Sequence, residues 1–269
     1  MKDNFYNIDF DAVNHGFGRM ADVYDELQKT NAIVGIMRRK YYNVIMETIN
    51  PPADILELNC GSGIDALYLS GKGYNILATD ISEKMLENAR LKGNNENLNF
   101  KQLNFNQLNN IEGCFDLIIS NFGGLNCYDD LNFISEQTAR LLKPGGYFIA
   151  TVMPKFSLWE LALIFKGELK RGLRRINQNG TIANVGGEKV FVRYYSPSYF
   201  YKYFRNRFNF IKIKAPSVFF PPPTALNWYH SHLKISSFFY KLDKIIENLF
   251  LSAFFGDYYI IVLKKRGIE

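Results

Sequence analysis

Between residues 53 and 153, short apolar runs alternate with segments whose apolar residues recur every three or four positions. Such runs predict buried strands, and the periodic segments predict amphipathic helices. The predicted strands are 54–58, 74–80, 98–103, 115–120 and 145–152, and the predicted helices are 64–70, 83–92 and 131–142. Strands and helices that alternate at this spacing indicate βαβ units, and therefore a parallel sheet covered on both faces.

The flanking segments follow other patterns. Residues 5–50 are predicted to be helical, with 32–49 as the longest helix, and Pro51-Pro52 ends this region because proline removes a backbone donor. Beyond residue 153 we expect, in order, a helix over 156–175, a β-hairpin over 181–195 around Gly186-Gly187, a helix from 196, a strand over 208–214, an amphipathic helix over 233–255 and a strand over 258–263.

Composition adds two points to this picture. The chain contains 23 Phe and 17 Tyr, which can fill a large core or line an apolar cavity. The net charge of +6 is mild for 269 residues, and no long basic stripe indicates a nucleic-acid partner. One dense basic patch stands at helical spacing and predicts either a solvated helix face or a contact with an anionic substrate or lipid head group: Lys166, Lys170, Arg171, Arg174 and Arg175.

The cysteines and the apolar runs bear on the compartment. Cys60, Cys114 and Cys127 cannot all pair, and their spacing is not that of a disulfide framework, so a reducing environment is expected. The first residues lack the basic-then-apolar order of a secretory signal, and no run approaches the ~20 apolar residues of a transmembrane helix. We therefore expect a cytoplasmic protein with no transmembrane segment.

The sharpest chemical signal is the turn Glu57-Leu-Asn-Cys-Gly-Ser-Gly63, which lies between a predicted strand and a predicted helix. Gly61 and Gly63 allow a tight turn and a close approach of backbone to ligand, and the free amides of the next helix favour an anionic group. Glu57 can meet a cationic amine. Asp80, at the end of the second predicted strand, stands where a carboxylate accepts hydrogen bonds from ribose hydroxyls.

These residues resemble the class I S-adenosylmethionine-dependent methyltransferases over about residues 53–153. Glu57, Gly61 and Gly63 match the family's first motif, and Asp80 with its neighbours matches the second-strand region. Lys143-Pro-Gly-Gly146 before the fifth strand is a further shared feature. The resemblance implies an α/β, doubly wound, mostly parallel seven-stranded Rossmann-like sheet whose last strand is antiparallel, with helical and hairpin insertions that form a cap.

The resemblance also implies where S-adenosyl-L-methionine would bind. The methionine part would lie on the backbone near Asn59 and Gly61, and the ribose on Asp80. The residues predicted for the adenine are Ile81, Met85, Asn104 and Phe105, and those predicted to lie beside the sulfonium are Asn121, Phe122 and Gly123. The run Phe17-Gly-Arg-Met-Ala-Asp-Val-Tyr-Asp25 resembles the family's N-terminal cap, in which Tyr24 would fold over the cofactor, although an ordinary helix start fits it equally.

Two positions depart from the family pattern. Asn59 replaces the small residue that is commonest before Cys-Gly, which alters the turn. Asn104 replaces the acid expected for the adenine amino group, although an amide carbonyl can accept the same hydrogen bond.

The resemblance divides the chain into four parts. These are an N-terminal helical cap (1–50), a cofactor-binding core (51–153), an insertion of a helix and a β-hairpin (154–195), and the remainder of the sheet (196–269) with a helical lid (215–255). We expect the acceptor site in the parts outside the core, and the helical lid is predicted to form one wall of it. Their Phe, Tyr and Trp content favours a small apolar or aromatic metabolite, such as a polyketide, quinone-like or lipid-derived molecule.

No catalytic residue can be assigned and no metal is expected. His15, His230 and His232 are the chain's histidines, and each is as easily a surface or core residue as a general base. A nicotinamide oxidoreductase is disfavoured because Ala66 stands where its fingerprint needs a third glycine. A non-catalytic S-adenosylmethionine-binding regulatory module, a methyltransferase acting on a lipid or nucleic acid, and a homodimer remain open.

Overall fold

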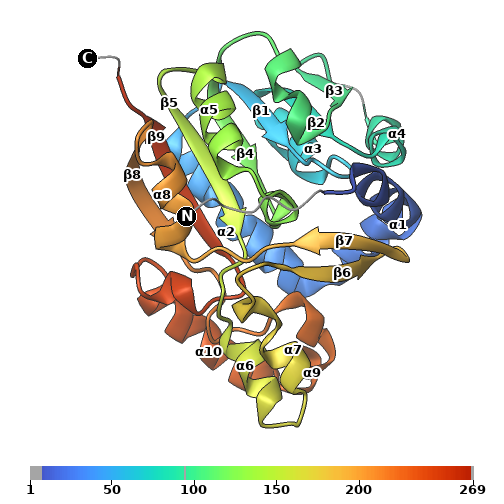
Figure 1. Cartoon of the computed structure of the whole chain (residues 1–269), viewed down its shortest axis with the longest axis vertical. Helices are drawn as coiled ribbons and strands as arrows, with labels where there is room; N and C mark the ends of the chain where they lie inside the picture. The colour runs from blue at the N-terminus through green and yellow to red at the C-terminus, as the bar shows by residue number, and fades with distance from the viewer. Residues whose placement is uncertain (1–7, 94, 268–269) are drawn as a thin grey trace.

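The computed structural model describes residues 8–93 and 95–267 and contains one seven-stranded sheet, in the order β3-β2-β1-β4-β5-β9-β8 (Figure 1). Its strands are β1 (Asp54–Leu58), β2 (Asn75–Asp80), β3 (Leu98–Gln102), β4 (Phe115–Ser120), β5 (Leu142–Val152), β8 (Phe208–Lys214) and β9 (Tyr259–Lys265). β9 runs antiparallel to both of its neighbours, and the other six strands are parallel to one another. The predicted mostly parallel sheet with an antiparallel last strand is confirmed.

The central strands are apolar almost throughout because helices cover both faces of the sheet. Successive residues of β1 contribute to opposite clusters, with Ile55 in one and Leu56 in the other, as strand alternation requires. The first cluster also contains side chains of α2 (Ala32–Thr48), α3 (Ile64–Ser70) and α4 (Glu83–Leu91). The second contains side chains of α5 (Leu131–Leu141) and α8 (Pro197–Phe204), so these two groups of helices lie on opposite faces.

The N-terminal region contains a longer helix than the sequence predicted. α1 (Phe10–Thr30) has 21 residues and α2 has 17, so the expectation that 32–49 would be the longest helix is wrong. Asn31 separates the two helices with an extended backbone, and its side chain accepts hydrogen bonds from the amides of Ile33 and Val34 at 3.1 and 3.3 Å. An N-cap residue in the middle of the apolar pattern therefore sets this boundary.

The helix predicted over 156–175 is broken into α6 (Leu158–Ile164), α7 (Leu169–Gly172) and the 3-10 turn η3 (Arg174–Ile176). Gly167 adopts a φ of 81°, in the left-handed region that ends helices. The break also divides the predicted basic patch. Arg174 and Arg175 turn back onto Glu160 at 2.6 and 2.8 Å, while the remaining members of the patch stay exposed.

The predicted β-hairpin is confirmed as β6 (Thr181–Val185) and β7 (Glu188–Val192), a separate two-stranded sheet. Its tip lies against α1, as Figure 1 shows. A Cβ atom on Gly186 would approach the carbonyl oxygen of Gly16 to 2.3 Å, so the two backbones meet where neither residue has a side chain. Arg19 extends from α1 to Glu188 at 2.9 Å and fixes this contact.

Candidate active site

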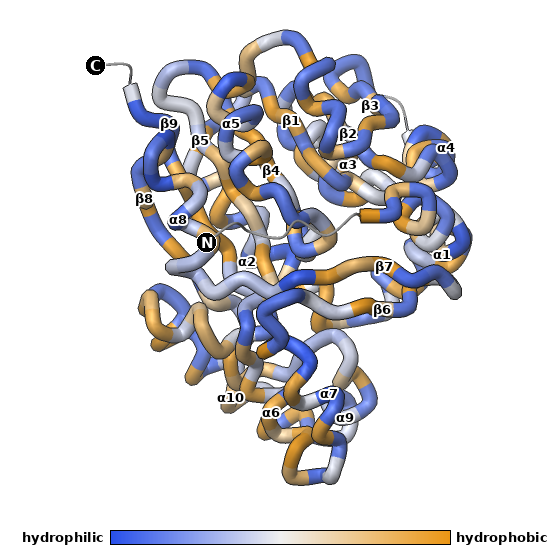
Figure 2. The backbone as a smooth tube through the Cα atoms, in the orientation of Figure 1, coloured by the Kyte–Doolittle hydropathy of each residue, from blue (hydrophilic) through white to orange (hydrophobic). Residues whose placement is uncertain are grey.

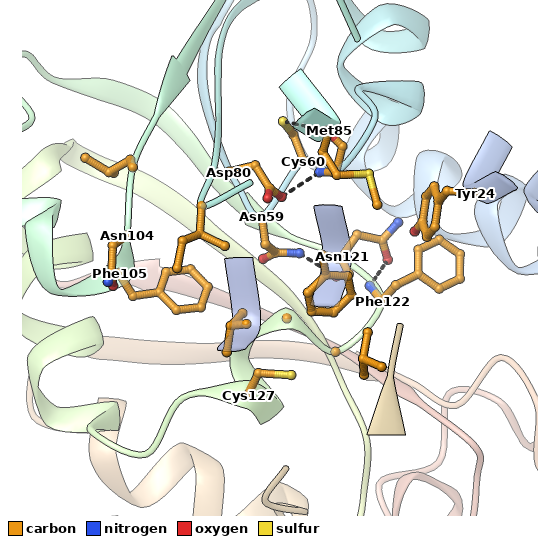
Figure 3. A pocket seen from close by; sticks show the side chains of 18 of the residues that line it. Tyr24, Asn59, Cys60, Asp80, Met85, Asn104, Phe105, Asn121, Phe122 and Cys127 are labelled. Carbon is orange, nitrogen blue, oxygen red and sulfur yellow. Dashed lines mark hydrogen bonds between the residues drawn. The ribbon is translucent and has the colours of Figure 1, made fainter. Parts of the chain in front are cut away.

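A cavity of about 270 Å³ lies where the carboxyl ends of β1, β2 and β4 meet the covering elements α1 and the β6–β7 hairpin (Figure 3). Its volume is close to the lower end of the roughly 300–1,000 Å³ typical of small-molecule sites. The strand order reverses between β1 and β4, and ligands of open α/β sheets bind at such a reversal. The cavity therefore lies where the fold class predicts one.

The cavity gathers eleven of the thirteen residues that the sequence analysis predicted for the cofactor. They are Tyr24, Asn59, Gly61, Asp80, Ile81, Met85, Asn104, Phe105, Asn121, Phe122 and Gly123. Glu57 and Gly63 do not line it. The lining residues come from segments up to about one hundred positions apart, and the parallel strands bring them together at one edge of the sheet.

Gly63 lies in the turn for a packing reason. Its φ is 75°, and a Cβ atom there would come within 2.8 Å of the Ala89 Cβ and 3.0 Å of the Phe100 ring. Glycine at this position lets the turn pass against α4 and β3. The Gly-x-Gly pattern therefore combines two functions, with Gly61 facing the cavity and Gly63 facing the protein interior.

Glu57 is enclosed in the protein, with 1% of its surface exposed. Burial, together with the negative charge of Asp65, raises the pKa of its carboxyl well above the ordinary value. Its Oε2 atom is among the buried atoms with no hydrogen-bond partner in the described part of the chain. Glu57 is therefore enclosed behind the cavity wall and does not line the cavity, and its contact with a cationic amine stays a prediction.

Asp80 is held rigidly at the cavity wall by backbone amides. Its carboxylate accepts hydrogen bonds from the amides of Gly61 at 2.7 Å and Ser82 at 2.9 Å, one on each oxygen. Burial raises the pKa of Asp80, and the two amides act in the opposite direction. Each oxygen keeps a second lone pair, so the side chain can accept two further hydrogen bonds from a ligand.

Asn59, one of the two departures from the family pattern, joins the turns after β1 and β4. Its Nδ2 donates to the carbonyl of Asn121 at 2.9 Å, and its Oδ1 accepts from the Ser120 hydroxyl at 2.6 Å. Gly124 leaves the space for it, since a Cβ atom there would lie 2.2 Å from the Asn59 Cγ. The asparagine is thus paired with a glycine 65 positions away, which the sequence alone did not indicate.

An ion pair that the sequence analysis missed also lines the cavity. Arg38 of α2 donates to Asp65 of α3, and its guanidinium lies 4.6 Å from the centre of the Phe122 ring. Asp65 also accepts from the Tyr42 hydroxyl at 2.5 Å and from Asn121 Nδ2 at 2.8 Å. The buried Nε of Arg38 has no hydrogen-bond partner among the described residues. A cation and an anion side by side suit the carboxylate and ammonium of an amino-acid moiety.

The residues predicted for the adenine all line the cavity. Ile81 and Met85 line it, and Met85 has 1% of its surface exposed. Asn104 also caps the short helix η1 (Phe105–Asn110), where its Oδ1 accepts from the Asn106 amide at 3.0 Å. One lone pair of that oxygen is therefore already engaged, and Phe105 adds an aromatic wall.

The cover of the cavity consists of α1 and the hairpin, and its side chains are mostly apolar. They are Phe10, Val13, Phe17 and Tyr24 from α1, with Val185 and Val192 from β6 and β7. Burial raises the pKa of Tyr24 to about 12, so its phenol is neutral at physiological pH. Asp25, the next residue, binds Lys92 and the Ser62 hydroxyl, each at 2.5 Å, and so fastens α1 to the glycine-rich turn.

The segment predicted as a helical lid does not reach the cavity. No residue of 215–255 lines it, so this segment forms no wall of the cavity, and its place beside the acceptor stays a prediction. The shorter hairpin and α1 cover the cavity instead. None of the three histidines lines the cavity either, and His232 Nδ1 is 3.0 Å from the Trp228 carbonyl. Within residues 8–93 and 95–267, no cluster of His, Cys, Asp or Glu is arranged to hold a metal ion.

Comparison with known proteins agrees with this site. Residues 56–150 match the family model described as "Methyltransferase domain". This range contains β1 to β5 except for the first residues of β1 and the last two of β5. The matched segment therefore carries the glycine-rich turn, Asp80 and the turn after β4, whereas α1 and the hairpin lie outside it.

Two curated relatives and one solved structure illustrate the range of similar proteins. A ubiquinone/menaquinone biosynthesis C-methyltransferase of Rickettsia typhi is 33% identical over 153 residues, which are 53% of this chain and 61% of that protein. A malonyl-[acyl-carrier protein] O-methyltransferase of Enterobacter lignolyticus is 28% identical over 192 residues, 67% of this chain and 71% of that one. The [4+2]-cyclase SpnF shares the fold, with a TM-score of 0.62 at 14% identity over 96% of each chain.

Proposed function

We propose that this chain is a class I S-adenosylmethionine-dependent methyltransferase and that it methylates a small apolar or aromatic metabolite. The match spans about three fifths of the length of the first curated relatives, and the relatives differ in whether carbon or oxygen is methylated. The acceptor must therefore be argued from this chain's own residues. The observation that carries the proposal is the apolar cover of the cavity, opposite a polar wall suited to the cofactor.

The polar wall fits S-adenosyl-L-methionine in three places. Asp80 has free lone pairs for ribose hydroxyls, and Arg38 with Asp65 suits the amino-acid end. Ile81, Met85 and Phe105 provide apolar surface for the adenine. When bound, the cofactor supplies a methyl group on a sulfonium, which is a good leaving group.

The protein's contribution is then alignment and exclusion of water. Phe10, Val13 and Phe17 from α1, with Val185 and Val192, would hold an apolar acceptor over the polar wall. Well-oriented reactants can gain on the order of 7–11 kcal/mol from positioning alone.

Among the described residues that line the cavity, none is an evident general base. Burial raises the pKa of the Cys127 thiol to about 12, as it does for Tyr24. The carboxylates of Asp65 and Asp80 are held by Arg38 and by backbone amides. We therefore propose an acceptor whose nucleophilic atom needs no proton removed by the protein, such as an ionised oxygen or a stabilised carbanion.

The test is to incubate the protein with cofactor and a cell extract and to search for a metabolite whose mass rises by one methylene. The Asp80→Ala variant is the control, since it should bind little cofactor. A labelled apolar metabolite supports the proposal. Cofactor binding without transfer to any acceptor would instead favour the non-catalytic regulatory module, and a labelled polar macromolecule would contradict the acceptor class.

A further inference from the structure

Helix α10 (Leu233–Ile246) carries large apolar side chains on its outer side as well as on the side that packs against the core. Ser236 and Asp243 are 1% and 0% exposed, whereas Ile235, Phe238 and Ile245 are 45%, 57% and 75% exposed. A helix that only covered a core would keep its outer side polar. The outer apolar stripe, predicted to face a pocket, is therefore left exposed by the part of the chain that the structure describes.

The buried polar side of α10 has a clear structural purpose. The Asp243 carboxylate accepts hydrogen bonds from the amides of Val218, Phe219 and Phe220 at 3.1, 2.9 and 2.9 Å. The three amides of this loop need a hydrogen-bond acceptor, and α10 is oriented so that Asp243 provides it. The orientation that satisfies these amides turns the apolar stripe outward.

Other exposed apolar side chains gather on the same part of the molecule. We define the helical lobe as residues 156–176 and 223–254, which contain α6, α7, α9 (Leu226–Ser231) and α10 and lie below the hairpin in Figure 1. The turn between α6 and α7 exposes 93% of Phe165 and 56% of Leu169. Figure 2 shows the apolar colouring of this lobe along α6 and α10. Trp159 and Trp228 pack edge to face at 4.9 Å and join α6 to α9.

The exposed charge of the helical lobe is predominantly positive. Its exposed cations are Lys166, Lys170, Arg171, Arg174, Lys234, Lys241 and Lys244. Its acids are buried or engaged: Glu160 binds Arg174, Asp243 binds the loop amides, Glu247 binds Lys40 at 2.8 Å, and Glu168 pairs with Arg171. An apolar surface thus lies among lysines with few anions to balance them.

We propose that the helical lobe docks on the surface of an anionic lipid bilayer. Apolar side chains such as Phe165 and Phe238 would enter the boundary between head groups and acyl chains, and the lysines would meet anionic head groups. No helix in the described ranges is long and apolar enough to cross a membrane, which fits attachment at the surface. A second copy is a poorer occupant, because a two-fold contact would place one lysine-rich face against another.

Two short segments join the helical lobe to the cavity, and one of them starts at Met153, which lines the cavity three residues before the lobe begins. β6 leaves the helical lobe at Thr181 and reaches the cavity wall at Val185. The docking proposal does not depend on the proposed methyl transfer, since vesicle binding can be measured without cofactor or acceptor.

The experiment is flotation of the full chain with two kinds of vesicle, phosphatidylcholine alone and phosphatidylcholine mixed with phosphatidylglycerol. We expect binding to the mixed vesicles that weakens as salt is added, because salt screens the lysines. The chain's two tryptophans, both in the helical lobe, provide a second readout, since brominated lipid should quench them.

Two variant sets separate the apolar and the charged contributions. The first is Phe165→Ser, Phe238→Ser and Ile245→Ser, and the second is Lys166→Gln, Lys170→Gln, Lys234→Gln and Lys241→Gln. Each should weaken vesicle binding by about tenfold or more. The matched control replaces similar residues far from the lobe, with Leu91→Ser, Lys72→Gln and Lys101→Gln, and should leave binding unchanged.

Three outcomes would overturn the proposal. The first is equal affinity for the two kinds of vesicle, or no binding to either kind. The second is a control set that weakens binding as much as the lobe variants. The third is a dimer in sedimentation velocity that the Phe238→Ser set converts to monomer, with no vesicle binding by either form; the apolar stripe would then be a contact between copies.

Discussion

The cavity end of the sheet and the helical lobe both bury polar side chains, but they place their apolar residues differently. At the cavity, Asp80 and Asn59 hold turns in position, and the apolar side chains of α1 and the hairpin close over them. In the lobe, Arg175 and Asp243 hold the segments together, and many apolar side chains remain outside. An apolar stripe on a helix therefore indicates a contact surface, but it does not indicate whether the partner surface belongs to the same chain.

The comparison is tested most strongly by removing one phenylalanine from each environment. Phe200 is fully buried and stacks on Phe204 at 4.7 Å, so Phe200→Ala should lower the free energy of unfolding by about 3–5 kcal/mol. Phe238→Ala, at a site 57% exposed, should change it by about 0.5 kcal/mol or less. Urea unfolding of both variants measures the difference, and a loss at Phe238 as large as that at Phe200 would mean that the stripe is packed in the free protein.

Loss of an ion pair from the cluster of Arg175, Asp257 and Glu160 should lower the free energy of unfolding nearly as much. Arg175 is 4% exposed in its side chain and binds Asp257 at 2.6 Å, beside Glu160. Arg175→Met leaves the buried Asp257 without this partner and Glu160 with Arg174 alone, and should cost about 3–5 kcal/mol. The exposed Arg171→Met, which loses only the pair with Glu168, is the control and should cost at most about 1 kcal/mol.

The same variant has a defined pH dependence. Burial raises the pKa of Asp257, and Arg175 opposes this, so Arg175→Met should raise that pKa further. A carboxyl whose pKa is higher in the folded than in the unfolded state favours folding at low pH and disfavours it as the pH rises. The loss of stability in Arg175→Met relative to the unchanged protein should therefore become smaller toward acid pH. Thermal unfolding at several pH values measures it. A loss that does not change with pH would mean that the Arg175–Asp257 pair is unimportant.

At the cavity, loss of a polar anchor should affect binding more than folding. Asp80→Ala removes the acceptors predicted for the ribose, at about 1.5–3 kcal/mol for each charge-assisted hydrogen bond. Calorimetry should show cofactor binding weakened at least about tenfold, with native circular dichroism. Glu83→Ala, an exposed acid on the neighbouring helix, is the control, and an unchanged dissociation constant in Asp80→Ala would remove Asp80 from the site.

The smallest expected effect is a difference in the rate at which the three cysteines are alkylated. It tests whether α1 and the hairpin close the cavity. Cys114 is exposed, whereas burial raises the pKa of the Cys127 thiol to about 12 and that of Cys60 well above its usual value. Because the thiolate is the reactive form, iodoacetamide at neutral pH should modify Cys114 first. Mass spectrometry should find all three modified only after unfolding, and equal rates in the native protein would show that α1 and the hairpin do not shield the cavity.

The sequence by itself determined the local features of this protein. The bounds of β1, β4 and β8 were predicted to the residue, because each is a short apolar run between breakers. Strand alternation with helices was enough for the parallel sheet, and residues at consecutive strand ends necessarily share one edge. This is why ten of the eleven predicted cofactor residues in the lining share one cavity, with Tyr24 added from α1, although their contacts with the cofactor remain a prediction.

The tertiary structure alone decided what distant segments do to one another. Arg38 meets Asp65 only because α2 packs beside α3, and Asn59 fits only because Gly124 leaves space 65 positions away. Glu57 and Gly63 belong to the predicted motif, yet the fold turns them toward the interior. The amides near Phe219 donate to Asp243 of α10, and this buried contact is made between segments that the sequence pattern does not connect. Because a helix turns as one unit, the side opposite Asp243 faces outward, which the apolar pattern alone does not predict.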